Sequence, residues 1–249
     1  MKEINESLKN KNLTQKEYFI KSFAVLKEMF SKDRKYLPSI IALFALSGYT
    51  MYNSFEAMIR ASIAKQPFPK LPLPAMLINL LIVIVIEYAL NLFQNDVISR
   101  IDEKNELTRK DVLLRSITLA IIMTFISNFI KPLGIIGVAV IFVFAYFAAF
   151  FRQIYLSRNV SLTTAFEKNA RLLEGNRVTI ILPLFLINVI SAIVSSVLMS
   201  YASVTVLQSP NPAVPVTVIL IISRILIGIF EIYKKILASV IFLNVENNK

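Results

Sequence analysis

The stretch that decides the fold is residues 72–94, PLPAMLINLLIVIVIEYALNLFQ, in which Glu87 is the single charged side chain. A helix of about 20 residues crosses the hydrocarbon core of a bilayer, which is about 30 Å thick. Unpaired backbone amides are too costly in lipid, so an apolar run of this length predicts a transmembrane α-helix. Further runs lie at about 37–58, 113–130, 133–151, 178–201 and 213–233. We therefore expect an all-α fold, a polytopic membrane helical bundle with six transmembrane helices.

The composition narrows the functional classes. Hydrophobic residues make up 56% of the chain, and it contains neither Cys nor His. Disulfides, the common zinc sites and His-based catalysis are thereby excluded. The sequence also lacks the G-x-S-x-G and G-x-x-x-x-G-K-[ST] motifs of α/β-hydrolases and P-loop ATPases. We predict that the protein is not an enzyme and has no catalytic, cofactor-binding or metal-binding residues.

The basic residues predict the orientation in the membrane. Of the 27 Lys and Arg residues, 22 lie before the first run, in alternate loops or in the tail, and four lie in the opposite loops. Arg224 is inside the sixth run. Positive charge marks the cytoplasmic side, so we expect a multi-pass protein of the bacterial cell membrane with cytoplasmic N- and C-termini. This topology explains the net charge of +11 without a nucleic-acid partner.

Three regions follow from these patterns: a flexible tail at 1–12, an amphipathic interfacial helix at 13–36, and a single-domain six-span bundle at 37–249. Thr14 and Glu17 have the spacing of a capping box, which predicts a helix start. From there one helix face carries the residues Phe19, Ser22, Phe23, Val25, Leu26, Met29 and Phe30. Such a helix suits the cytoplasmic headgroup layer, although packing against the bundle would use the same face.

The first span is the least apolar of the six. It is interrupted by Ser39, Ser47, Thr50, Asn53, Ser54 and Glu56. We expect it to face other helices or a hydrated cavity more than lipid.

Two charges lie deep inside the predicted spans, and such charges are candidates for function because burying them is costly. Glu87 lies roughly 20 Å from the outer end of span two, and Arg224 roughly 15 Å from the outer end of span six. We predict an intramembrane Glu87–Arg224 ion pair if the two helices are adjacent. The pair would serve either to fix helix register or to bind substrate and gate.

Residues 161–190 resemble a segment of bacterial six-span proteins related to the glycerophosphoryl diester phosphodiesterase membrane domain. The resemblance rests on Ala165, Phe166, Leu172, Gly175 and Asn176. It implies a short helix entering a membrane span. Independently of the resemblance, Leu162, Phe166, Ala170 and Leu173 form a helical stripe, and Gly175 after it predicts a left-handed helix stop. The soluble phosphodiesterase domain has no counterpart in this chain, so the resemblance implies no activity.

Two functions remain open. A membrane subunit of a transport system, the permease-like partner of a separate ATPase, would use segment 100–112 or helix 162–174 for coupling. The candidate coupling surface consists of Arg109, Lys110, Phe166, Lys168 and Arg171. The alternative is a stand-alone protein that binds membrane lipids or other membrane proteins in envelope maintenance or self-protection.

Overall fold

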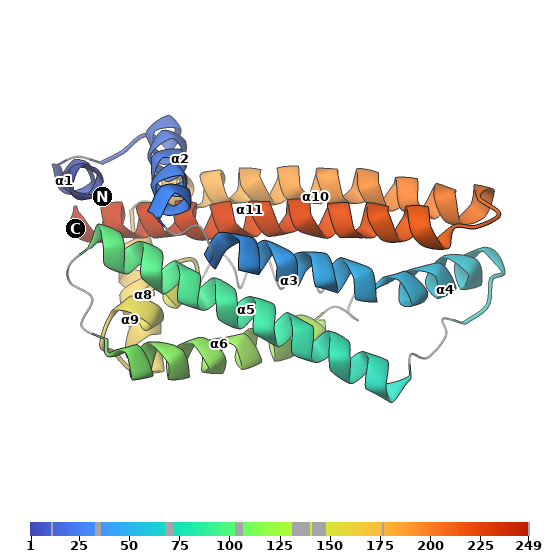
Figure 1. Ribbon diagram of the computed structural model, residues 1–249. Helices are drawn as coiled ribbons and strands as arrows, with labels where there is room; N and C mark the ends of the chain where they lie inside the picture. The colour runs from blue at the N-terminus through green and yellow to red at the C-terminus, as the bar shows by residue number, and fades with distance from the viewer. Residues whose placement is uncertain are drawn as a thin grey trace. The chain divides into compact units, whose positions relative to one another are not determined.

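The computed structural model describes the chain except for residues 11, 33–35, 68–71, 103–106, 131–139, 141–147, 176 and 249. The described residues are almost entirely helical and contain no strand, as the all-α prediction requires (Figure 1). The helices are α1 (Lys2–Asn10), α2 (Gln15–Lys32), α3 (Tyr36–Thr50), α4 (Tyr52–Ile63), α5 (Leu73–Ile101), α6 (Arg109–Ile130), α8 (Phe151–Ser157), α9 (Leu162–Leu173), α10 (Arg177–Gln208) and α11 (Ala213–Asn247).

Three of the described helices are long and apolar enough to cross a membrane, which indicates a membrane protein. They are Leu73–Ile101, Ile180–Gln208 and Ala213–Asn247. Each covers nearly all of one predicted apolar run, 72–94, 178–201 or 213–233, and continues beyond its C-terminal end, because a helix does not have to end where the apolar stretch ends. The predicted span at 133–151 lies mostly outside the described residues.

The chain divides into two compact units, each assembled from segments far apart in the sequence. Unit 1 comprises Met1–Arg34, Glu87–Ile187 and Ile232–Lys249, and unit 2 comprises Lys35–Ile86 and Asn188–Glu231. Helices α5, α10 and α11 contribute residues to both. The region predicted as one domain, 37–249, therefore supplies residues to both units, and its single-domain character stays a prediction.

The N-terminal residues of unit 1 differ from the predicted flexible tail, because residues 2–10 form α1. Ile4 and Leu8 are spaced one helical turn apart, so they share a face, and both are buried. The carbonyl of Leu8 accepts a hydrogen bond of 2.8 Å from the amide of Asn244 in α11. A polar composition suggested disorder, but two apolar residues at helical spacing are enough to dock this short helix.

Helix α2 begins with the predicted capping box. The Thr14 backbone N–H donates to the Glu17 carboxylate at 2.8 Å, and the Glu17 N–H donates to the Thr14 hydroxyl at 3.4 Å. Tyr18 is buried one residue later, and its hydroxyl donates to Asn244 Oδ1 at 2.8 Å. Burial, aided by the charge of Glu17, raises the pKa of Tyr18 to about 12. The capping box is thus confirmed, and the neighbouring turn is fixed to the rest of unit 1.

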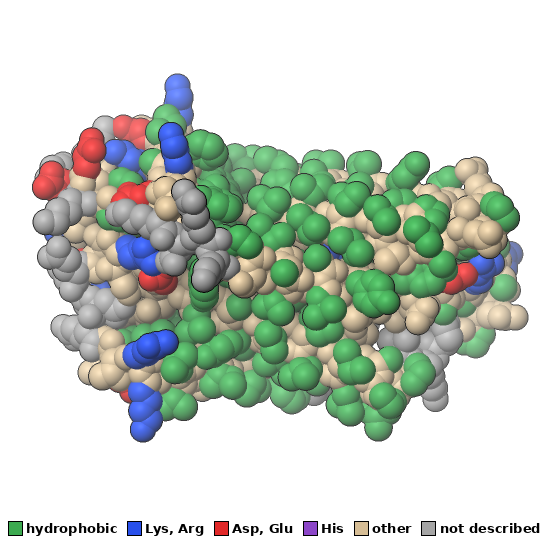
Figure 2. All heavy atoms as spheres, viewed as in Figure 1, with side chains coloured by type: hydrophobic (Ala, Val, Ile, Leu, Met, Phe, Trp, Pro, Cys, Tyr) green, Lys and Arg blue, Asp and Glu red, His purple; other side chains and the backbone are tan. Residues whose placement is uncertain are grey.

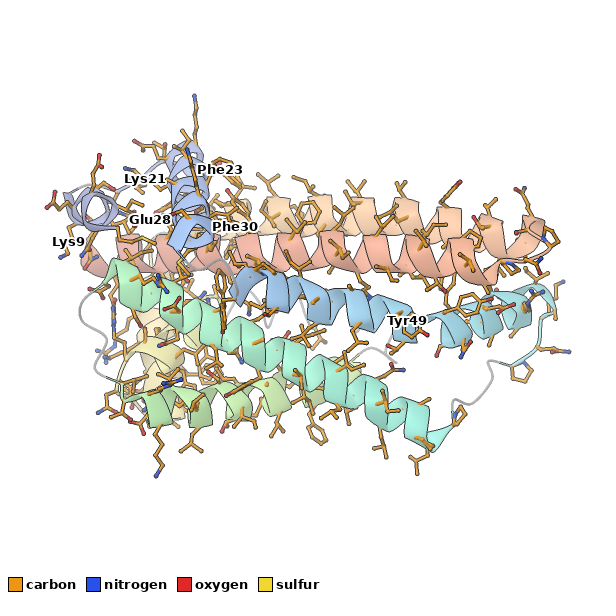
Figure 3. All side chains as sticks on the ribbon, in the orientation of Figure 1. Lys9, Lys21, Phe23, Glu28, Phe30 and Tyr49 are labelled. Carbon is orange, nitrogen blue, oxygen red and sulfur yellow. The ribbon has the colours of Figure 1, made fainter. Side chains whose placement is uncertain are left out.

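The apolar side chains of α2 divide between two environments. Ser22, Val25 and Met29 are buried inside unit 1. Phe23 and Phe30 are 63% and 45% exposed and project from the same side of the helix (Figure 3). The predicted apolar face is therefore only partly used for packing, and the placement of α2 at a membrane interface stays a prediction.

Arg158 is the centre of a charged cluster that holds unit 1 together. It follows α8, and its guanidinium bonds to Asp102 at 2.7 Å and to Glu246 of α11. Its carbonyl accepts a bond of 2.7 Å from Arg115 of α6. Burial alone lowers the pKa of Arg158, but the hydrogen bonds and charges of Glu246 and Asp102 outweigh it, so the pKa lies above its ordinary value. One arginine thus connects four separate segments.

Unit 2 is apolar inside and outside. Its core contains Ala202 and Val206 of α10 and Val216 and Leu220 of α11, with α4 residues packed against them. Its charged side chains number only seven: Lys35, Glu56, Arg60, Lys65, Lys70, Arg224 and Glu231. Hydrophobic side chains also cover the visible face over α3 and the unit 2 part of α10 (Figure 2). This surface suits lipid better than water.

Within unit 2, α3 and α11 approach closely at two glycines. A Cβ added at Gly48 would lie 2.8 Å from both the Cα of Ile221 and the carbonyl oxygen of Leu220. A Cβ added at Gly228 would lie 2.7 Å from the ring of Phe44. Small residues allow helix backbones in membranes to approach in this way.

Replacing Gly48 with Ala is expected to destabilise the protein by about 1–3 kcal/mol, because the added methyl group meets backbone atoms that cannot rotate away. Alanine is intrinsically the better helix former, so any net loss reflects the clash. The measurement is the thermal unfolding of the purified protein in detergent. Ala42→Val, at an exposed position of the same helix, is the control and should change little. Equal stability of Gly48→Ala and the parent would contradict the close packing.

Candidate functional site

The first predicted span is interrupted in unit 2, where α3 ends at Thr50 and α4 begins at Tyr52 (Figure 1). The hydroxyls of Ser47 and Thr50 donate to the carbonyls of Phe44 and Ser47, at 2.8 and 3.1 Å. Bonds of this kind compete with the helical ladder and often bend helices. Met51 lies at the interruption, and its N–H bonds to the Gly48 carbonyl at 3.3 Å.

A pocket of about 380 Å³ opens beside this interruption, which is large enough for a small ligand. We call it the outer pocket. Its lining residues come from α3, α4, α5 and α11 and are Tyr49, Thr50, Tyr52, Asn53, Ala75, Ile78, Asn79 and Thr217. Tyr49, which projects from the C-terminal end of α3, is seen in Figure 3. Thr50 and Asn53 therefore line a cavity, as expected for the polar residues of the first span.

Arg224 of α11 reaches the same interruption. Its Nε and Nη2 atoms lie 2.9 and 2.7 Å from the sulfur of Met51. A thioether is a weak acceptor, whereas a guanidinium carries five N–H donors. Within the described part of the chain, no carboxylate pairs with Arg224. The structure thus presents a cation in an apolar unit with only a neutral partner.

The second intramembrane charge, Glu87, has a partner in unit 1. The Arg152 guanidinium of α8 donates to the Glu87 carboxylate at 3.2 Å, and both side chains are largely buried. The predicted Glu87–Arg224 pair is not among the contacts of either residue, which belong to different units, and it stays a prediction. Position along the predicted spans was the available signal: Glu87 lies in the second half of the run 72–94, and Arg152 directly follows the run 133–151.

A seam of buried amides continues from Glu87 along α5. Asn91 donates to the Ser116 carbonyl of α6 at 3.0 Å, and Asn95 donates to the Leu156 carbonyl of α8. Gln94 is also fully buried. These positions repeat at helical spacing on one face of α5, which is the pattern of interhelical hydrogen bonding. We interpret this seam as structural.

The residues of the predicted coupling surface all lie in unit 1. Arg109 and Lys110 are exposed in the first turn of α6, and Lys168 and Arg171 are exposed on α9. Helix α8 packs against both α6 and α9. Phe166 is 43% exposed while its ring stacks on Phe151 at a centroid distance of 4.0 Å. The surface is therefore basic, with one partly exposed aromatic side chain.

Helix α9 is firmly placed. Its buried side consists of Ala165, Asn169 and Leu173, and Asn169 accepts a hydrogen bond of 2.8 Å from the Phe150 N–H. Ser161 caps its start by accepting from the Thr164 N–H at 3.2 Å. Gly175 follows its end with φ of +81°, which confirms the predicted left-handed stop.

Comparison of the chain with protein-family models, with curated proteins and with solved structures finds no match. The resemblance of residues 161–190 to the phosphodiesterase-related membrane domain is therefore neither supported nor contradicted, and it stays a prediction.

Proposed function

We propose that the protein is a non-enzymatic, transport-related subunit of the bacterial cell membrane and the permease-like partner of a separate ATPase. The observation that carries this proposal is the outer pocket beside an interrupted span, with an intramembrane arginine that contacts Met51 at the interruption. Membrane transporters commonly place their binding sites at discontinuous helices, and charges kept within spans mark such sites. A purely structural bundle would need neither the interruption nor the charge.

The proposal includes six spans with both termini in the cytoplasm. The three long apolar helices would be joined by α3 with α4, by α6 and by the apolar run 133–151. The low charge of unit 2 supports its placement in the hydrocarbon region, and the basic residues at the start of α6 and on α9 support a cytoplasmic position for those two segments. The chain has no Cys, so single cysteines would report this topology directly: Ser209→Cys should react with an impermeant reagent from outside, and Lys168→Cys should not.

The ATPase would contact α9 and the start of α6. Helix α9 is anchored on one side through Ala165, Asn169 and Leu173 and presents Phe166 and Lys168 on the other. A short helix that is rigidly held and exposes basic and aromatic side chains is suited to transmit a partner's movement to the helices that follow it.

A mild-detergent pull-down from the native membrane tests this function. We expect a stoichiometric ATPase with the wild-type protein, and its loss when Lys110→Glu and Lys168→Glu are combined. The control combines Lys16→Glu and Lys27→Glu, which makes the same charge change at exposed positions of α2, and it should retain the ATPase. Recovery of no ATPase with the wild-type protein would contradict the proposal, as would equal recovery with the Lys110/Lys168 variant.

One observation favours the alternative of a stand-alone protein that binds lipids or other membrane proteins. Ile20, Phe23 and Phe30 leave an apolar side of α2 exposed beside basic residues, as in helices that lie on anionic membranes. Recovery of the protein alone, or only with lipid, would support a role of this kind in envelope maintenance or self-protection. The resemblance of residues 161–190 to the phosphodiesterase-related membrane domain would fit either function.

A further inference from the structure

We propose that Arg224 and the outer pocket together bind the anionic group, a carboxylate or a phosphate, of a small ligand or a lipid. This inference names the chemical class of the substrate of the proposed function. It rests on that function only in assuming that the bound ligand is transported. Binding itself is a property of unit 2 and is tested on the purified protein alone.

Among the described residues, Arg224 has no acidic partner, and its hydrogen bonds are to the Met51 sulfur. Of the two acidic residues in unit 2, Glu56 is already bonded to Arg60 at 2.8 Å. Glu231 lies seven positions further along α11, which is roughly 10 Å at about 1.5 Å per residue. A cation in an apolar setting is expensive unless something pairs with it.

The guanidinium contacts a residue that adjoins the pocket lining in the chain. Met51, which it contacts, is flanked in the chain by Thr50 and Tyr52, and both of these line the pocket. Thr217, a third lining residue, precedes Arg224 by seven positions on α11 and therefore shares its helix face. The N-terminal lean of helical side chains directs Arg224 toward Thr217.

The polar side chains that line the outer pocket are neutral and include hydrogen-bond donors. The side chains of Tyr49, Asn53, Asn79 and Thr217 all carry hydrogen-bond donors, and none of the four makes a hydrogen bond within the described structure. No carboxylate is among the lining residues. A guanidinium with unused N–H groups beside neutral donors is complementary to an oxyanion, since arginine binds carboxylate and phosphate through paired hydrogen bonds. A cationic ligand would instead be repelled by the positive charge of Arg224.

The test uses a fluorescent reporter placed in the pocket. The chain has no Trp, so Ile78→Trp introduces a single indole at an apolar lining position and leaves every donor in place. This reporter protein, reconstituted in phosphatidylcholine nanodiscs, is titrated with inorganic phosphate and with succinate. In a third arm, phosphatidylglycerol replaces part of the phosphatidylcholine. We expect a saturable change in emission: a response to phosphate or succinate identifies a soluble anion, and a response to phosphatidylglycerol alone identifies a lipid headgroup.

In the reporter protein, Arg224→Gln should weaken the affinity for the anion that gives the response by about tenfold or more. This is the scale expected for charge-assisted hydrogen bonds. Lys65→Gln removes one positive charge from an exposed position of unit 2 and is the matched control, with affinity expected to be unchanged. Thr217→Val and Asn79→Leu should also weaken binding, and they keep the test decisive if Arg224→Gln does not fold.

The proposal is overturned if no arm saturates in the reporter protein, or if the Arg224 and pocket variants bind like their parent. The titration and the pull-down test the two proposals separately. If no ATPase is recovered but the reporter protein binds an anion, the transport function is contradicted and the anion site is supported. If an ATPase is recovered but no anion binds, only the anion site is contradicted.

Discussion

Replacing Arg158 with Met is expected to lower the stability of the protein by about 3–5 kcal/mol, because it leaves buried carboxylates without their cation. Asp102 is only 2% exposed, and Arg158 itself is 11% exposed, so water cannot take over the lost contacts. The same change removes the bond to Glu246 and the stacking of the guanidinium over Phe242 at 5.5 Å. Thermal unfolding of the purified protein in detergent measures the loss.

Two comparisons make this result specific. Arg60→Met breaks an exposed pair with Glu56, and such pairs are worth at most about 1 kcal/mol, so this variant should stay close to the wild type. Asp102→Asn combined with Arg158→Met should recover part of the loss, since it removes a carboxylate charge that has lost its bond to the Arg158 guanidinium. If Arg158→Met were no less stable than Arg60→Met, the cluster would not hold unit 1 together.

Replacing Asn244 with Leu should cost about 2–5 kcal/mol and release the N-terminal segment. Asn244 is fully buried and accepts hydrogen bonds from the Leu13 N–H at 3.1 Å and from the Tyr18 hydroxyl at 2.8 Å. It also donates to the Leu8 carbonyl. Leucine has a similar size but no polar atoms, so two buried donors lose their acceptor, and each costs about 1–3 kcal/mol.

The release of the segment can be observed directly, because the chain contains no Cys. In a Leu8→Cys background, the thiol should react slowly with maleimide, since position 8 is buried, and much faster once Asn244→Leu is added. Asn12→Leu, at an exposed position of the same segment, is the control and should leave the reaction slow. Equal labelling rates in all three proteins would contradict the anchoring role of Asn244.

The two units use their buried charges differently. In unit 1, Arg158 bonds to two carboxylates, and Glu87 bonds to Arg152. Such groups are satisfied, and removing one partner should mainly affect stability. In unit 2, Arg224 has a sulfur as its partner. Removing a charge that has no counter-ion should cost little stability, and this difference is why we assign a binding role to Arg224 and structural roles to the others.

Local patterns in the sequence were reliable guides to the helices. The predicted apolar runs 72–94, 178–201 and 213–233 each coincide with one of the three long apolar helices. Thr14 and Glu17 form the capping box, and Gly175 takes the left-handed conformation. These features depend on residues a few positions apart, so their spacing contains the required information. The prediction of a flexible tail at 1–12 was wrong for residues 2–10, which form α1. This helix is held by a hydrogen bond between Leu8 and Asn244, which are 236 positions apart.

The sequence by itself determined that the described chain is helical, that α2 begins at a capping box of Thr14 and Glu17, that Gly175 makes a left-handed stop after α9, and which helices are apolar enough to enter a membrane. These properties follow from hydrophobic content and backbone hydrogen bonding within single segments. Only the tertiary structure decided which polar groups meet: Glu87 with Arg152, Arg158 with Asp102 and Glu246, and Arg224 with Met51. The partners are 56 to 173 positions apart, and the spacing along one helix does not determine which face of another helix will lie beside it.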